Sequence, residues 1–353
     1  NQGIKINEKS LVWAKNKENI QKTAIQISIE KKYIEIFKSI LLKTKMNQDE
    51  ILMLLYIAVE NNSYDMSKLL ISYINNLNDD SICLIKKELF YISIENNNLD
   101  ILNLLIDYFF GNGIYNDLSF LSGKELKVAI KNNNEEIVNY LLSSSNVKYD
   151  LNLKIGLSNG TVLHQAIINR NLKIVKILCS LHDIDINSKI VYENQNVREE
   201  KTGLHLAIEI NQNDIAKYLL SLPNIDVNDL YISKYDTKYN EKTALQLAIE
   251  KNNTDITKIL LQRKDIIVKN LSYNKNKTLL QIAVENRNLD IIKLLLDIVE
   301  IDVNCSSTEV IHGDYKITKR VKNALHIAVS SGNLNIVELL LNHKNIDINS
   351  KYT

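Results

Sequence analysis

Cysteine, proline, glycine and tryptophan are all scarce in this chain. Its 353 residues include three cysteines, one proline, nine glycines and one tryptophan. Cys83, Cys179 and Cys305 lie far apart and form no CxxC pair, which argues against a disulfide framework and against a zinc ribbon. Because this use of cysteine fits a reducing compartment best, we expect the protein to be cytoplasmic.

Long apolar runs and an excess of one charge are also missing. No apolar run approaches the roughly 18 residues that suggest a membrane-spanning helix. The first residues, NQGIKINEKS, lack the apolar segment of a signal peptide. The formal net charge is +1, and lysines are mixed with glutamates and aspartates. This mixture gives no strong field for nucleic acid or an anionic membrane, so we expect neither a nucleic-acid partner nor a membrane span.

Motifs for catalysis, cofactors and metals are missing as well. The sequence has no GxxxxGK[ST], HExxH or GxSxG, and no third glycine follows Gly111-Asn-Gly113 at the spacing of a dinucleotide fingerprint. His164, His205 and His326 occupy the same place in three repeated units, so they lie at least one repeat apart and do not converge on one metal ion. We expect no enzyme activity, no cofactor and no metal site, and we interpret these histidines as structural.

The chain does contain a repeat. TGLHLAIEINQNDIAKYLL begins at Thr202, and TALQLAIEKNNTDITKILL begins at Thr243. Each unit has two stretches of apolar residues at helical spacing, separated by a polar break, and a small residue lies in the first stretch. The pattern predicts two helices of about eight to ten residues, which are marginal alone in water and must therefore stack on neighbours. The small residues are Ser28, Ala58, Ser93, Ala129, Ala166, Ala207, Ala248, Ala283 and Ala328.

Caps are marked in several units. Thr23, Thr243 and Thr278 are each followed three residues later by glutamine, which is the spacing of a capping box. Thr161 and Thr202 keep this spacing with histidine in place of glutamine.

The turn between the two helices is marked by its residue type. Four residues after the small position most units have asparagine or glycine, which tolerate the left-handed conformation of a tight turn. Lys32, Arg170 and Arg287 break this rule, so we expect strain or a different turn there. The residues that follow the rule are Asn62, Asn97, Asn133, Asn211, Asn252 and Gly332.

These units resemble the ankyrin repeat, whose signature is T-P-L-H-x-A, a glycine turn, a second helix and a tail similar to G-A-D-V-N. The unit from Thr161 reads TVLHQAIINRNLKIVKIL and closes on DIDIN at Asp183 to Asn187. The proline of the family is replaced in these units, and the glycine before the tail is usually Asn, Asp or Glu, which should loosen individual units. The resemblance implies an all-α, ankyrin-type helical-repeat solenoid with projecting β-hairpin fingers.

The resemblance covers residues 23–349, which we expect to form a single solenoid of about nine repeats. Residues 1–22 are expected to be a partial repeat or finger and residues 350–353 the start of a further finger, so the natural protein is expected to be longer. The expected repeats are 23–45, 53–76, 88–110, 124–150, 161–187, 202–228, 243–269, 278–304 and 323–349.

Three fingers are expected to be enlarged. They lie between Asn187 and Thr202, between Asn228 and Thr243, and between Asn304 and Asn323. The third contains TEVIHGDYKIT, and a two-residue hairpin turn is expected at its Gly313-Asp314 pair.

The resemblance implies a non-catalytic scaffold that binds another protein through its concave groove and fingers. Two alternatives stay open: a targeting or regulatory arm of a larger enzyme or channel, and a structural element of a permanent assembly. The sequence identifies neither the partner nor the oligomeric state.

Two sets of residues are candidates for partner binding. Glu209, Glu250 and Glu285 each follow the small residue by two positions, where the resemblance places them in the groove. They predict an acidic stripe that favours a partner with a basic surface, or they are ordinary exposed helix residues. Residues of the fingers are the second set, because tyrosine is enriched at interfaces, although it also packs well in strands. These finger residues are Tyr192, Tyr235, Tyr239, His312 and Tyr315.

Overall fold

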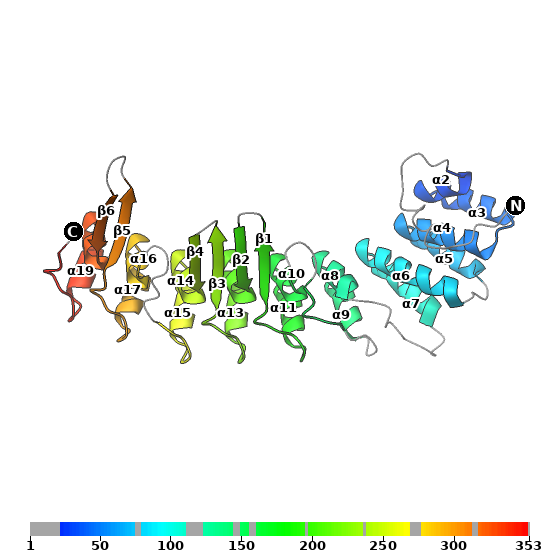
Figure 1. The fold of residues 1–353 in the computed structure, drawn as a ribbon. Coiled ribbons are helices and arrows are strands. Elements are labelled where there is room, and N and C mark those ends of the chain that lie inside the picture. The colour runs from blue at the N-terminus through cyan, green and yellow to red at the C-terminus, as the bar shows by residue number, and fades with distance from the viewer. Residues whose placement is uncertain are drawn as a thin grey trace. The chain divides into compact units, whose positions relative to one another are not determined.

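The computed structural model divides the chain into two compact units, Asn1–Asp150 (unit 1) and Leu151–Thr353 (unit 2) (Figure 1). Each unit is a stack of helix pairs, in which the first helix of a pair is here called inner and the second outer. A single solenoid across the boundary between the units stays a prediction. The structure describes residues 22–74, 79–110, 123–143, 149–154, 160–194, 197–235, 238–268, 277–312 and 317–351.

Unit 1 has inner helices of unequal length. Two of them, α4 and α6, have 13 and 17 residues, so the prediction of eight to ten residues is wrong for them. In α4 the additional turns have their own cap at Asn47, with Glu50 completing a capping box, and bury Ile51 and Leu52. The helices of unit 1 are α2 (Ala24–Glu30), α3 (Ile34–Lys43), α4 (Gln48–Glu60), α5 (Tyr64–Tyr73), α6 (Asp79–Glu95), α7 (Leu99–Phe110), α8 (Gly123–Lys131) and α9 (Glu135–Ser143).

Unit 2 is more regular. Each of its described inner helices has 7 residues and each outer helix has 8. Within the described residues of both units, no helix is long and apolar enough to cross a bilayer. The helices of unit 2 are α10 (Val162–Ile168), α11 (Leu172–Cys179), α12 (Gly203–Glu209), α13 (Asn213–Leu220), α14 (Ala244–Glu250), α15 (Thr254–Leu261), α16 (Leu279–Glu285), α17 (Leu289–Leu296), α18 (Ala324–Ser330) and α19 (Leu334–Leu341).

The three enlarged fingers are antiparallel strand pairs, as predicted. The first two join into one sheet in the order β1-β2-β3-β4, because β2 pairs with β3 of the next finger, while β5 and β6 form a separate sheet (Figure 1). His312 pairs with Ile317, and the predicted two-residue turn at Gly313-Asp314 lies outside the described residues. The strands are β1 (Lys189–Glu193), β2 (Val197–Thr202), β3 (Leu230–Tyr235), β4 (Lys238–Thr243), β5 (Ser307–His312) and β6 (Ile317–Lys322).

The recurring small residue lines the seam between stacked inner helices. Ala166, Ala207 and Ala248 are 0% exposed on α10, α12 and α14, and these helices contact one another in order. In unit 1, Ala58 is likewise 0% exposed on α4, which contacts α2 and α6. The prediction of a shared buried seam is therefore confirmed. A small side chain lets the neighbouring backbones approach, and a larger one would overpack the seam.

The left-handed turn is common to every described repeat. The predicted asparagines and Gly332 have positive φ angles, which confirms the pattern. Lys32, Arg170 and Arg287 adopt the same conformation, with φ of 58°, 60° and 56°, so the expectation of a different turn is wrong. The stacking of the two flanking helices fixes the turn even where the residue type disfavours it.

The capping boxes predicted for the three Thr-x-x-Gln units form with one exception. Capping boxes are present at Thr23 and Thr278, where the glutamine three residues later accepts from the backbone N–H of the threonine. The prediction is wrong for Thr243. There the hydroxyl still accepts from the backbone N–H of Gln246, but the side chain of Gln246 donates to Glu250 at 3.3 Å.

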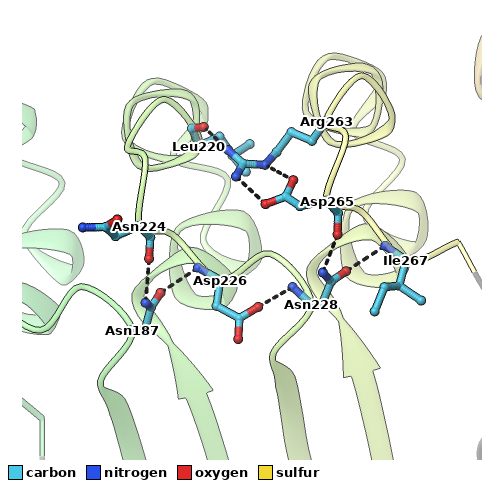
Figure 2. A network of polar contacts seen from close by, with 8 residues as sticks. All are labelled: Asn187, Leu220, Asn224, Asp226, Asn228, Arg263, Asp265 and Ile267. Atoms are coloured by element: carbon cyan, nitrogen blue, oxygen red, sulfur yellow. Dashed lines mark hydrogen bonds and ion pairs between the residues drawn. The ribbon is translucent and has the colours of Figure 1, made fainter.

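An asparagine in the tail of a repeat binds the backbone of the next tail (Figure 2). The side chain of Asn187 donates to the carbonyl oxygen of Asn224 at 2.8 Å and accepts from the N–H of Asp226 at 2.9 Å. An amide can do both because it carries a donor and an acceptor. This tail clamp recurs with Asn152, Asn228 and Asn304.

Candidate partner-binding surface

The strand register decides which finger residues share a face. Ile190 lies opposite Lys201, and Tyr192 lies opposite Glu199. Side chains alternate along a strand, so these four residues lie on the same face of the sheet. Lys201 on this face donates a hydrogen bond to Glu209, the last residue of α12. The face of the sheet therefore continues onto the inner helices. We call it the groove face.

Lys201 is the most enclosed charged residue of the groove face. Its Nζ lies 2.7 Å from Glu209 and 3.0 Å from Glu199, and its side chain is 5% exposed. The ammonium also lies 5.3 Å and 4.9 Å from the ring centroids of Tyr192 and Tyr231. Burial lowers the pKa of Lys201, but the hydrogen bonds to Glu209 and Glu199 outweigh this effect and the net shift is upward. The side chain therefore stays charged and ties the finger to α12.

The same pairing recurs along unit 2. Lys242 lies 2.5 Å from Glu250, and Lys277 lies 2.8 Å from Glu285. The predicted acidic stripe is thus a row of lysine–glutamate pairs. In each pair the lysine stands directly before the cap threonine of the inner helix and eight residues before the glutamate. Sequence reasoning missed these lysines, although the repeated Lys-Thr dipeptide before each such helix was a usable signal.

The pairs differ in exposure. The lysine side chains are 5%, 21% and 36% exposed at Lys201, Lys242 and Lys277. The glutamate side chains are 30%, 27% and 36% exposed. The pair Lys277–Glu285 is therefore the most accessible of the three, whereas the side chain of Lys201 is almost fully buried.

The predicted finger residues are only partly placed. Tyr192 lies in β1, half-buried beside Lys201, and burial raises the pKa of its hydroxyl. The side chains of Tyr235, Tyr239 and His312 and the whole of Tyr315 lie outside the described residues, so their roles stay predictions.

Tyr231, which also lies in the second finger, is buried. Its ring centroid lies 6.2 Å from that of His205, which gives it a packing role at the base of the finger.

The repeated histidines take part in capping the inner helices. His164 and His205 are both buried, and the Nδ1 atom of each lies 2.8 Å from the hydroxyl of its cap threonine. Burial lowers the pKa of His205 to about 4, and this effect outweighs the opposing field of Asp229. The imidazole is therefore neutral near pH 7. Among the described residues, no three His, Cys, Asp or Glu side chains come close enough to hold a metal ion.

Cys179 is not poised for chemistry. It lies half-buried on α11, and burial raises the pKa of its thiol to about 11. The thiolate, which is the nucleophilic form, is therefore scarce at neutral pH.

Comparisons with known proteins agree with the repeat architecture. The family model "Ankyrin repeats (3 copies)" matches residues 55–155, 89–190, 126–231 and 227–307, and the model "Ankyrin repeat" matches residues 322–352. No curated protein sequence matches the chain.

Two solved structures are among those to which the chain is similar. The ankyrin repeat domain of Bcl-3, described as a unique member of the IkappaB protein family, is 18% identical, with a TM-score of 0.47 over 71% of this chain and 97% of that one. A chain from the complex of the Bd0816 predatory endopeptidase of Bdellovibrio bacteriovorus with the immunity protein Bd3460 is 21% identical, with a TM-score of 0.44 over 64% of this chain and 100% of that one. The family models match most of the sequence between residues 55 and 352, and the chain therefore belongs to the ankyrin repeat family.

Proposed function

We propose that this protein is a non-catalytic scaffold that binds another protein through the groove face and fingers of unit 2. Ankyrin repeats are in general protein–protein interaction modules. The observation that carries the proposal is the contrast between buried and accessible side chains in unit 2. All residues of α12 and α14 before the terminal glutamate are buried, so on the groove face the fingers and the lysine–glutamate pairs supply the accessible side chains. Such a preorganised surface loses little entropy when it binds.

We propose further that the partner presents basic side chains to the glutamates. A partner cation must compete with the lysine that each glutamate already holds. This competition is easiest at Glu285, because both members of the pair Lys277–Glu285 are 36% exposed. It is hardest at Glu209, whose partner Lys201 is 5% exposed and held by Glu199 as well.

The test begins with proximity labelling in the source cell, followed by cross-link mapping of the captured partner. We expect cross-links on the fingers and on the ends of the inner helices. Cross-links confined to the outer helices would contradict the proposal.

Affinity measurements with the identified partner then test the charge. Glu285→Gln should weaken binding up to about fivefold, as expected for an exposed ion pair, and should reduce its salt dependence. Asp255→Asn is the matched control, because it breaks the exposed pair between Asp255 and Lys217 of the outer helices. Equal effects of the two variants would show that the partner does not use the glutamates.

The third finger allows a separate test. Deletion of residues 309–316 removes His312 and Tyr315, and we expect it to weaken partner binding without a change in helical content. A loss of the helical circular dichroism signal would instead show that this finger belongs to the core.

A further inference from the structure

The last described helix pair of unit 2, α18–α19, leaves an apolar face open. Val329, which follows the small residue Ala328 of α18, is 60% exposed. In the other repeats of unit 2 this position is 0% exposed, and its residues there are Ile167, Ile208, Ile249 and Val284. Ile348 in the tail of the last pair is likewise 65% exposed, whereas its equivalents Val227 and Val303 are 1% and 2% exposed.

One internal junction shows directly what covers the position of Val329. A Cβ added to Gly203 of α12 would lie 2.8 Å from the Cδ1 atom of Ile167 on α10. Ile167 therefore packs against the start of the next inner helix, at a place four residues before the small residue Ala207. We call this place the seat. Glycine or alanine there, as at Gly203 and Ala244, leaves room for the branched side chain of the preceding repeat.

A cleft lies beside Val329. Its volume is about 360 Å³, and Leu325, His326, Val329 and Ile348 are among the residues that line it. At the internal junctions of unit 2 the next inner helix contacts the equivalent surface, as α14 does on α12. Val329, Ile348 and the cleft form what we call the trailing face.

The first described helix pair of unit 1, α2–α3, leaves a different face open. Ala24 occupies the seat of α2 and is exposed, whereas Leu54 and Leu89 occupy it in α4 and α6 and are 6% and 0% exposed. Ile36 of α3, eight residues after the small residue Ser28, is 53% exposed. The residues at that place in α5, α7 and α9 are at most 1% exposed, and they are Met66, Ile101 and Ile137. We call Ala24 and Ile36 the leading face.

The burial of these positions shows which neighbour covers each of them. In the last pair of unit 2 the seat residue Ala324 is 1% exposed and Ile336, at the place of Ile36, is 0% exposed. In the first pair of unit 1, Ile29 at the place of Val329 is 0% exposed. The preceding repeat therefore covers the seat and the place of Ile36, and the following repeat covers the place of Val329. The trailing face and the leading face are thus the two sides of one kind of junction.

We infer that the trailing face of one copy of this chain stacks on the leading face of a second copy, with Val329 against Ala24. This contact continues the established seam between inner helices, because it joins the same two sides that meet at every internal junction. Open apolar surface of this kind marks an interaction site. A head-to-tail contact is heterologous, so each dimer keeps one free face of either kind and can add further copies.

Sedimentation velocity of the full chain over a concentration series tests the contact. We expect the natural sequence to form dimers and longer oligomers as its concentration rises. Val329→Asp disables the trailing face and Ile36→Asp disables the leading face, because each would bury an unpaired carboxylate, so either variant alone should stay monomeric. Ala24→Arg, on a different helix, should act as Ile36→Asp does. Val299→Asp is the matched control and should associate as the natural sequence does, since Val299 is 96% exposed and lies outside both faces.

An equimolar mixture of the Val329→Asp and Ile36→Asp variants gives the sharpest result. The first variant keeps its leading face and the second keeps its trailing face, so the mixture should form dimers that do not grow. Circular dichroism of each variant checks that the helices are intact. A natural sequence that stays monomeric over the whole series would overturn the inference, as would a mixture that stays monomeric while the natural sequence associates. Oligomers that persist in the single variants would also overturn it, since the contact would then lie elsewhere.

Discussion

Among the described residues, the asparagines of unit 1 tie neighbouring repeats at the turn end of the helix pairs, where the left-handed turn lies. In unit 2 most such ties lie at the finger end, where the tail leads into the next strand. The side chain of Asn96 donates to the carbonyl oxygen of Val59 at 3.0 Å, and that of Asn132 donates to Ile94 at 2.9 Å. Unit 2 relies instead on tail clamps such as that of Asn187. Ties in the manner of unit 1 occur in unit 2 as well, from Asn288 to Asn252 at 2.7 Å and from Asn253 to Asn213 at 2.7 Å.

The comparison shows that the stacking of helix pairs requires the buried small residue, whereas the position of the polar ties can vary. Both units bury the small residue of the inner helix, as at Ala58 and Ala207. The seam is therefore common to both units, while the polar ties among the described residues differ between them. Because a hydrogen bond contributes about 1 kcal/mol while burial acts along the whole helix, the seam contributes more to the stability of the stack than any single tie.

Acid should cause the largest difference in stability between the two units, because all six histidines of the sequence lie in unit 2. The pKa of His205 is about 4 in the folded chain, chiefly through burial, with Lys189 and Lys201 adding to the shift and Asp229 opposing it. Its ordinary value is 6.5, so the unfolded chain takes up the proton first as the pH falls. The contribution of His205 is complete above pH 6.5 and is lost between pH 6.5 and 4, a loss of order 3 kcal/mol.

Urea unfolding between pH 7 and pH 4 measures this loss. His205→Gln should remove most of the difference, since Gln281 fills the equivalent place naturally. An unchanged pH dependence in that variant would contradict the assignment to His205.

Overpacking the seam should have the next largest effect. Ala207→Leu adds volume at a site that is 0% exposed and should cost about 1–3 kcal/mol of unfolding free energy. Ala58→Leu in unit 1 should cost a similar amount, because its seam is equally closed. Ala24→Leu, an exposed helix site, is the matched control and should change stability by less than about 0.5 kcal/mol. An unchanged melting midpoint for Ala207→Leu would mean that the repeat register is wrong.

Removing a single hydrogen-bonded tie between repeats should cost less unfolding free energy, and the cost should differ between the two units. Asn228→Ala removes both hydrogen bonds of a tail clamp and should cost about 1–2 kcal/mol. Asn134→Ser in unit 1 keeps an N-cap but loses the bond to Asn97, so about 0.5–1 kcal/mol is expected. Chemical unfolding of each variant checks the order. A larger loss for Asn134→Ser would show that the turn end dominates in unit 1.

Removing the backbone strain of the left-handed turns should have the smallest effect, and it should raise the free energy of unfolding instead of lowering it. Lys32→Gly in unit 1 and Arg170→Gly in unit 2 remove a side chain from φ near 60° and should raise stability by about 0.5–1 kcal/mol. Gly332→Ala is the reverse control. Its φ is 65° and an added Cβ meets no atom within 4 Å, so only backbone strain should lower the melting midpoint. A gain in melting midpoint from Gly332→Ala would contradict this reading of the turns.

The repeat could be predicted because it follows from local sequence patterns. The tail clamps and the lysine–glutamate pairs could not, because they depend on contacts between residues far apart in the sequence or in different elements. The small residue at Ala207 and the cap at Thr278 depend on neighbours within one helix, so their spacing predicts them. The clamp of Asn187 joins residues 37 and 39 positions apart, and the sequence marks it only as a family tail. The pairing of Lys201 with Glu209 depends on a strand placing the lysine beside the helix, which no helical period describes.

Amide hydrogen exchange tests the tail clamp most directly. The N–H groups of Asp226, Ile267 and Asp347 each donate to an asparagine side chain of the preceding tail. Asn228→Ala removes the acceptor of the Ile267 amide and leaves those of Asp226 and Asp347 in place. We expect the amide of Ile267 to exchange markedly faster in this variant, while the other two keep their protection. Unchanged protection of Ile267 would contradict the claim that tail asparagines hold the finger end of unit 2 together.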